Sequence, residues 1–328
     1  MNDAPRSIMK RRKRFFPSLL FVAAVVFATN DAKYCRAATP DFAIEQQPDR
    51  LVISCVGQPV ATYVFRDTKI PRPYFAHVHV PSGRQVTRNH PPVEGQDKTD
   101  HADMHPGIWM AFGDLSGCDF WRNKDRIVHE AFVKTPHAQD HEAAFSVRNR
   151  YERADGTLVC YELCKLTLVN SPGGYMLHWD SQFSGDGEFY FGDQEEMGLG
   201  IRVSTAISVM KSGSMLDSEG RHNEKEIWGK SANWCDYSGN LGDQYIGMTL
   251  MCHPKNFRAS WMHARDYGFL TANPFGQKSF GKGDSSKVVV QPGETLRLRY
   301  GVLLHSASGT ERPDAASAYA EYVQNSGE

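Results

Sequence analysis

The chain has 328 residues, of which 41% are hydrophobic and 23% are charged. This balance is typical of a globular protein and excludes a disordered, collagen-like or coiled-coil chain. The first 28 residues hold six Lys or Arg and one acidic residue, so the remainder carries 31 basic and 37 acidic residues and a net charge of -6. Such an acidic body lacks the basic surface that binds a phosphate backbone, and we expect no nucleic-acid partner.

A basic and then apolar segment opens the chain. Five basic residues at positions 10–14 precede an apolar run from Phe15 to Ala28. This run is shorter than the roughly 20 residues that a membrane-spanning helix needs, and Val26 and Ala28 suit signal-peptide cleavage. We therefore expect residues 1–28 to be a secretory signal peptide, or alternatively an uncleaved anchor, and the protein to be periplasmic or secreted. No later run is comparably apolar, so we expect no other contact with a membrane.

Ten segments of the body alternate between apolar and polar residues, which is the pattern of a strand with one buried face. Turn sequences such as Pro81-Ser82-Gly83 separate neighbouring segments, as antiparallel strands require. The predicted strands are 51–56, 60–66, 74–80, 126–134, 144–151, 158–169, 175–183, 245–252, 287–291 and 295–305. They predict an all-β protein, a large antiparallel two-sheet sandwich.

The stretch from Asp100 to Lys124 breaks this alternation. His101 and His105, with Asp100 or Asp103, could bind a divalent metal, although the zincin pattern is absent because no Glu follows the first His. The alternative is a loop whose histidines make only structural hydrogen bonds.

The same stretch also suits recognition of a sugar. Trp109 and Trp121 offer flat apolar faces, and Asp119 and Arg122 offer directional hydrogen bonds. These four residues are predicted to bind substrate.

A second dense stretch, residues 191–202, contains Asp193, Glu195 and Glu196 ahead of an apolar segment. If they line a cleft, mutual repulsion and desolvation raise the pKa of at least one carboxyl group toward the range of a general acid or base. We predict that Glu196 is such a group and that Asp193 binds substrate; a solvated turn is the alternative.

A third dense region lies between residues 228 and 276. His263 and Arg265 are two residues apart on an expected strand, so they would share a face and form a proton-transfer and cation pair. The residues predicted to bind substrate here are Trp234, Asp236, Tyr237 and Asn273. Core packing is the alternative for the tryptophan, and no Gly-x-Ser-x-Gly elbow of a serine hydrolase is present.

Helix-forming residues with an aromatic stripe predict one short C-terminal helix at residues 313–324, with Pro313 near its start. No internal repeat divides the chain. We therefore expect a linker at residues 29–48 and a single β-sandwich domain at residues 49–328.

Several motifs occur together and in order: Pro-Ser-Gly-x-x-Val-Thr-Arg at 81–88, the block at 100–124, Gly-Asp-Gln-Glu-Glu-Met-Gly-Leu-Gly-Ile-Arg at 192–202, Trp-x-Asp-Tyr-Ser-Gly at 234–239 and Asn-Pro-Phe-Gly at 273–276. Over roughly residues 50–325 the chain resembles the exported PmoA-like family of uncharacterised proteins. The family's methane oxygenase label is set aside, because that enzyme subunit is a polytopic membrane protein. Commoner members have Asp-His-x-His-His-Arg before the Trp, whereas this chain has one extra residue, which leaves Asp100, His101 and Trp109 aligned and His105 out of step.

The strand count and the strand at residues 292–300 also resemble the galactose-mutarotase-like supersandwich. This resemblance implies a carbohydrate ligand and proton transfer by His and carboxylate side chains.

Three hypotheses follow. The first is an exported carbohydrate-active enzyme of the mutarotase, lyase or hydrolase type, with His101, His263 or Glu196 as acid and base, Arg265 stabilising negative charge, and Trp109, Trp121 and Trp234 stacking on the sugar. The second is a glycan-binding sandwich without catalysis. The third is a metal-dependent enzyme that uses His101 and His105.

Overall fold

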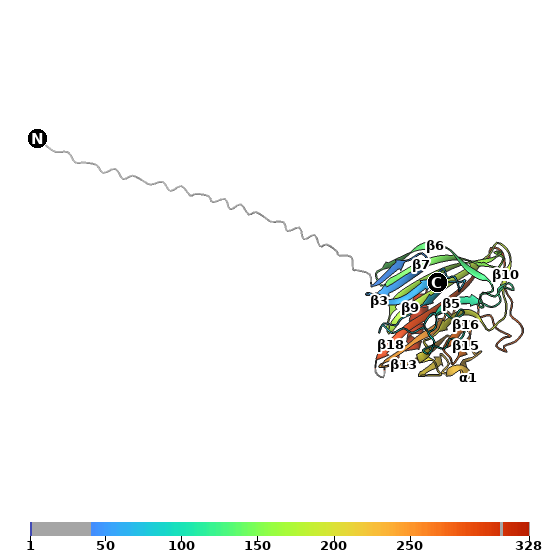
Figure 1. The fold of residues 1–328 in the computed structure, drawn as a ribbon. Coiled ribbons are helices and arrows are strands. Elements are labelled where there is room, and N and C mark those ends of the chain that lie inside the picture. Colours follow the sequence, from blue (N-terminus) through green and yellow to red (C-terminus); the bar gives the residue numbers. More distant parts are fainter. Residues whose placement is uncertain (2–40, 309–310, 328) are drawn as a thin grey trace. The chain divides into compact units, whose positions relative to one another are not determined.

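The computed structural model describes Met1, residues 41–308 and residues 311–327, so residues 2–28 of the expected signal peptide lie outside the described part of the chain. Two large sheets make up most of the described chain (Figure 1). The first sheet has eight strands in the order β1 (Phe42–Gln46), β2 (Arg50–Cys55), β3 (Gln58–Val64), β4 (Tyr74–Ala76), β5 (Ile108–Phe112), β11 (Met197–Arg202), β16 (Phe269–Asn273) and β15 (Trp261–Arg265).

The second sheet also has eight strands, and all its strand pairs are antiparallel, as in the first sheet. Its order is β12 (Gly213–Asp217), β13 (Trp234–Leu241), β14 (Gln244–Cys252), β18 (Leu296–Ser308), β9 (Gly174–Ser184), β8 (Leu158–Ser171), β7 (Glu142–Glu152) and β6 (Arg126–Gln139). A small third sheet pairs β10 (Phe189–Phe191) with β17 (Val288–Val290).

The core lies between the two large sheets, where inward-facing side chains of both interdigitate. Phe112 on β5 meets Phe183 on β9 edge to face, with ring centroids 5.4 Å apart. Each of the ten predicted strands overlaps an observed strand, although the segment 74–80 contains only the three-residue strand β4. The predicted fold class, an all-β two-sheet sandwich with a short C-terminal helix, is confirmed.

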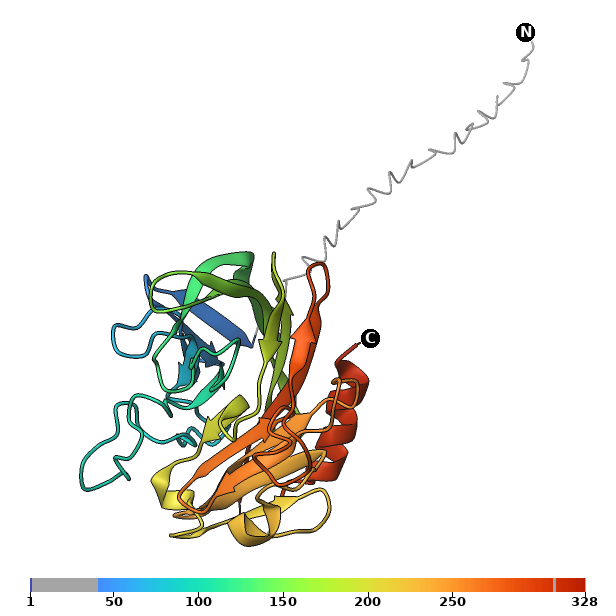
Figure 2. The ribbon, with the colours of Figure 1, turned by 90° about the vertical axis from the view of Figure 1, so that its right-hand side faces the viewer.

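Helix α2 (Ala315–Asn325) lies on the outer face of the second sheet (Figure 2). It begins two residues after Pro313, because the Asp314 side chain caps it by accepting hydrogen bonds from the amides of Ala316 and Ser317. The other helical segments are α1 (Asn223–Ile227) and a 3-10 turn at Thr205–Ile207. None of the helices in the described residues is long and apolar enough to span a membrane.

Four neighbouring strands of the first sheet, β5, β11, β16 and β15, are not among the ten predicted from alternation, although His263 and Arg265 on β15 are expected to share a strand. Nearly all of their residues are buried, so they show no alternation of apolar and polar residues. Loops cover their outer face, and the candidate site lies under these loops.

Candidate functional site

The outer face of β5, β11, β16 and β15 carries large side chains that belong to an apolar layer separate from the core. Trp109 on β5 pairs with Gly200 on β11, and Arg202 on β11 pairs with Phe269 on β16. A Cβ atom at Gly200 would lie 2.8 Å from the Trp109 ring. A larger residue at position 200 would therefore clash with the indole of Trp109, and glycine avoids this clash.

His105 stacks on this layer. Its ring is nearly parallel to those of Trp109, Phe269 and His101, with centroid distances of 5.0, 4.7 and 4.8 Å. Arg202 Nη1 lies 3.4 Å from His105 Nδ1, and because an arginine can only donate, Nδ1 accepts and the proton is on Nε2. Burial, reinforced by Arg202, lowers the pKa of His105 well below its ordinary value, so the ring is neutral.

Two buried arginines fix the loop that carries the histidines. Arg88 donates to the carbonyl oxygens of Lys98, Asp100 and His105 at 2.8, 2.7 and 3.0 Å. Arg72 donates to the carbonyl oxygen of Met104 and to that of Trp121. Because these carbonyls have a charged donor in a buried setting, the loop holds one conformation.

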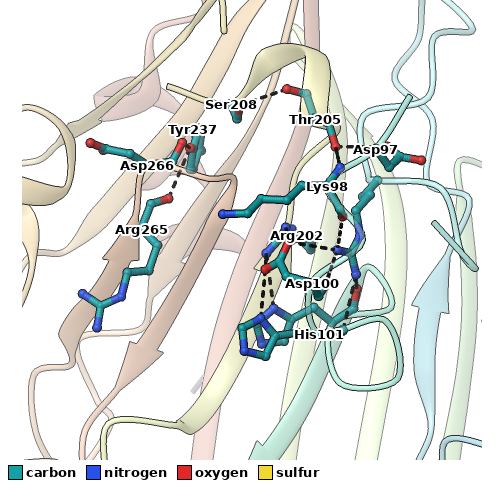
Figure 3. Close-up of polar contacts among 12 residues, drawn as sticks. Asp97, Lys98, Asp100, His101, Arg202, Thr205, Ser208, Tyr237, Arg265 and Asp266 are labelled. Carbon is teal, nitrogen blue, oxygen red and sulfur yellow. Dashed lines mark hydrogen bonds and ion pairs between the residues drawn. The ribbon is translucent and has the colours of Figure 1, made fainter. Parts of the chain in front are cut away.

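Asp100 joins this loop to the sheet, as Figure 3 shows. Its carboxylate accepts hydrogen bonds from Arg202 at 2.8 and 3.2 Å and lies 2.9 Å from His101 Nδ1. Burial alone would raise the pKa of Asp100, but Arg202 and His101 lower it below its ordinary value. The ionised carboxylate thus accepts a hydrogen bond from Nδ1–H of His101. In this tautomer Nε2 of the His101 ring is a hydrogen-bond acceptor.

His263 on β15 faces the loop from the other side. Its Nδ1 donates to the carbonyl oxygen of Glu195 at 3.1 Å, so Nε2 carries the lone pair. This Nε2 is buried without a hydrogen-bond partner among the described residues and lies 3.5 Å from Glu195 Oε2. Burial, together with nearby Arg265, lowers the pKa of His263 to about 3.

The adjacent acids Glu195 and Glu196 differ in their surroundings. Burial raises the pKa of Glu195, Arg265 opposes this effect, and Glu196 adds to it. Glu196 Oε2 accepts a hydrogen bond of 2.5 Å from Arg122, which also contacts Asp119 at 3.3 Å. Arg122 therefore holds the Glu196 carboxylate in place.

These groups line one cavity of about 70 Å³. The acid and base candidates His101, Glu196 and His263, from three distant segments, all contribute to its wall. The other lining residues are Met104, His105, Trp121, Arg122, Tyr267 and Phe269. The cavity presents hydrogen-bond donors and acceptors over an aromatic floor.

Three residues predicted to bind or act on the substrate adjoin this cavity without lining it, and one of them is Asp119, which contacts Arg122. Arg265 contacts Glu195 at 3.3 Å and Glu224 at 3.1 Å, so it acts on the carboxyl group beside His263. Trp109 is fully buried beneath His105 and exposes no indole face for a sugar to stack on.

The three residues of β13 that are predicted to bind substrate lie in the second sheet, away from the cavity. Asp236 is hydrogen-bonded to His305 at 2.7 Å, and Trp234 packs in the apolar cluster under helix α2. The Tyr237 hydroxyl donates to the carbonyl oxygen of Asp266 at 2.9 Å. The structure does not bring these three side chains to the cavity, because β13 and β15 belong to different sheets.

Asp193 and Asn273 hold the segment that carries Glu195. Asp193 accepts hydrogen bonds from the amides of Lys278, Ser279 and Ser286 at 2.7 to 3.0 Å. The Asn273 side chain donates to the carbonyl oxygens of residues 194 and 195. Both side chains are satisfied by the backbone, and neither lines the cavity.

The residues proposed as metal ligands do not converge. The rings of His101 and His105 are stacked, Asp100 is paired with Arg202, and Asp103 lines a different cavity. Within the described part of the chain, no three His, Cys, Asp or Glu side chains are grouped so as to hold a metal ion.

Sequence reasoning missed Arg88, Arg202 and Tyr267. The centroid of the Tyr267 ring lies 4.4 Å from Lys98 Nζ and 4.5 Å from the Arg202 guanidinium carbon, and the ring stacks on His101. Arg88 and Arg202 each end one of the motifs that carry the family resemblance, which is the signal that could have identified them.

No curated protein sequence matches this chain. The galactose 1-epimerase from Lactobacillus acidophilus is 7% identical with a TM-score of 0.40, over 83% of this chain and 99% of that one. A galactose mutarotase-like protein from Lactobacillus casei is 9% identical with a TM-score of 0.37, over 80% and 100% of the two chains. The alpha-galactosidase from Lactobacillus brevis is 9% identical with a TM-score of 0.37; the match covers 82% of this chain and spans only 40% of that enzyme. Similarities this remote do not indicate a shared activity.

A family model matches residues 50–321, a range that includes every residue of the cavity. The model describes a family of unknown function, so membership brings no activity with it. The chain belongs to this family, DUF6807.

Proposed function

We propose that the cavity is an acid–base site for a sugar or glycoside. The observation that carries the proposal is the convergence of His101, Glu196 and His263 on one enclosed space. A sugar hydroxyl donates one hydrogen bond and accepts others, so its recognition needs both kinds of partner. Nε2 of His263 and the Glu196 carboxylate accept, while Arg122 donates.

His263 and His105 would act differently on the substrate, the first as a proton acceptor and the second as a hydrogen-bond donor. His263 Nε2 has a free lone pair and would take a proton from the substrate, and the Glu195 carboxyl group beside it would stabilise the imidazolium formed. His105 is neutral and carries its proton on Nε2, because Arg202 donates to Nδ1, so it would donate a hydrogen bond to the substrate. Trp121 and Phe269 contribute apolar atoms to the cavity wall for the C–H groups of the sugar, but both rings are buried and offer no open face for stacking.

A glycan-binding role without turnover is the second candidate. The observation in its favour is that the pKa of His263 is about 3, which makes it a weak base. Efficient general bases have a pKa near the working pH. In this case His263 would serve only as a hydrogen-bond acceptor.

The cellular location is part of the proposal. We propose that residues 1–28 export the protein and that residues 49–328, together with β1 from the segment expected to be a linker, act as one domain outside the cytoplasm. We also propose that the PmoA-like resemblance reflects kinship without oxygenase chemistry. Fractionation of cells expressing the full chain, with a variant lacking residues 1–28 as control, tests the export.

A thermal-shift screen of the purified protein against mono- and oligosaccharides, with and without EDTA, tests the ligand class. A ligand at 100 times its dissociation constant stabilises the fold by about 2.7 kcal/mol, which raises the melting temperature by several degrees. We expect a response to a sugar that survives EDTA. The absence of any response to sugars, with a fall in melting temperature on chelation, would contradict the proposal.

Product analysis then separates catalysis from binding. We expect His263→Gln to lower the rate of sugar conversion by about 100-fold or more. His253→Gln is the matched control, because His253 is also a buried histidine but lies outside the cavity. Binding without conversion in the unmodified protein would favour the glycan-binding role.

A further inference from the structure

A second and larger cavity lies on the outer face of the first sheet. It measures about 380 Å³, and its floor is formed by outward-facing residues of β3 and β4, namely Val64, Tyr74 and Ala76. The cavity lined by His101, Glu196 and His263 measures about 70 Å³. Cavities that bind whole small molecules measure about 300–1,000 Å³, so the small cavity can enclose only the reacting end of a ligand, whereas the larger one can hold a whole unit.

The two cavities are neighbours. Asp103 lines the larger cavity and Met104, the next residue, lines the smaller one, so their Cα atoms are about 3.8 Å apart. The apolar layer under both cavities is also continuous, since a single cluster contains Val64 and Tyr74 of one floor and Trp121 and Phe269 of the other. The loop that carries Asp103 and Met104 thus contributes to both cavities.

The lining of the larger cavity balances charge. Three cationic and three carboxylate side chains contribute to it: Arg50, Arg66, Lys69, Asp49, Asp67 and Asp103. Such a lining favours a neutral ligand with many donors and acceptors over a strongly charged one. The apolar floor offers a surface for the C–H groups of a sugar ring.

The histidines at the two rims share an unusual backbone conformation. His77 borders the larger cavity and His101 the smaller one, with φ angles of 49° and 50°. Residues other than glycine rarely adopt this left-handed region, and such residues cluster at ligand sites.

We propose that the two cavities are neighbouring subsites of one binding site and that the ligand is a neutral oligosaccharide rather than a monosaccharide. The reacting unit lies in the cavity of His101 and His263, and the next unit lies against Arg50 and His77. This inference rests on the proposed function.

Isothermal titration calorimetry with matched sugars tests it. The probes are glucose and cellobiose, galactose and β-1,4-galactobiose, and xylose and xylobiose, each titrated into the full chain. We expect at least one disaccharide to bind tenfold or more tightly than its monosaccharide. In Arg50→Ala and His77→Asn this ratio should fall to within about threefold of one; asparagine tolerates the positive φ at position 77.

Arg84→Ala is the matched control. Arg84 is another exposed arginine, 3.9 Å from Asp243, and it lines neither cavity. The ratio should persist in this variant. Equal affinities within every pair, or a ratio that survives both subsite variants, would overturn the inference and leave the proposed function standing. If no sugar of either size binds, the proposed function fails and the inference fails with it.

Discussion

The two large sheets cover their outer faces in different ways. Helix α2 covers part of the second sheet through an apolar contact in which Ala318 and Tyr322 pack on Met251 and Leu303. Loops cover the first sheet around β5, β11, β16 and β15, and buried arginines hold these loops by their carbonyl groups. An apolar cover stabilises the fold, whereas a cover fixed by hydrogen bonds can also hold histidines and carboxylates around a cavity.

The outer faces of the two sheets also differ in the burial of their ion pairs, as one pair from each face shows. Arg202 binds Asp100 through two nitrogen atoms and is completely buried. Arg297 binds Asp180 through two nitrogen atoms as well, but its side chain is 37% exposed. The comparison predicts that loss of the Arg202–Asp100 pair lowers both stability and ligand affinity. Loss of the Arg297–Asp180 pair should change both only slightly.

The largest effect is expected for Arg202→Met. Removing this guanidinium leaves the Asp100 carboxylate without its main partner, and breaking a buried pair costs about 3–5 kcal/mol. Chemical denaturation should show this loss in the free energy of unfolding, and the thermal response to sugars should disappear. A stability close to that of the unmodified protein, with sugar binding retained, would contradict the role of the arginines.

Tyr322→Ala tests the contact between helix α2 and the second sheet. Tyr322 is buried and packs against Gly301 of the second sheet, so its truncation should cost about 3 kcal/mol or more. Calorimetry below the melting temperature should nevertheless show unchanged affinity for sugars. A loss of affinity in the folded variant would mean that the helix contributes to the site.

A smaller effect concerns acid sensitivity. The pKa of His263 is about 3 in the folded protein and about 6.5 in the unfolded chain. Between these values the unfolded chain binds a proton that the folded protein does not, so stability falls as the pH decreases, by about 1.4 kcal/mol per pH unit. His263→Gln should remove this contribution near pH 5.

His178→Gln provides a comparison for the pH dependence of stability measured with His263→Gln. Burial also lowers the pKa of His178, on the second sheet, to about 4, so its variant should also be less sensitive to acid. Only His263→Gln should change the response to sugars. A change of that response in both variants would remove the distinction between the two faces.

The smallest effect is expected for Arg297→Met. Pairs with substantial exposure contribute about 1 kcal/mol or less, and denaturation curves should shift accordingly. A loss as large as that of Arg202→Met would show that exposure does not distinguish the two pairs.

The contrast between the faces also explains what sequence reasoning could predict. Most strands of the second sheet have a solvated or only partly covered outer face, and segments such as 158–169 and 175–183 alternate clearly. In β5 and β11 every residue is buried, and the alternation vanishes because both faces are covered. The strands that build the site were therefore the ones that periodicity missed.

The residues of the site were predicted unevenly for a similar reason. His101, Glu196 and His263 were chosen for their chemistry, and the fold brings them together. Asp236 was chosen by the same criterion but lies on the second sheet, paired with His305. Chemistry along a chain identifies reactive side chains, while strand order decides which of them meet.

The most direct test of the site is nitrogen-detected NMR of the histidine side chains during titration with the most strongly stabilising saccharide. We predict that His263 is neutral with its proton on Nδ1, and that the signals of His101, His105 and His263 shift while those of His178 and His253 do not. Shifts confined to His178 and His253, or no shift in any of the five at saturating saccharide, would contradict the account.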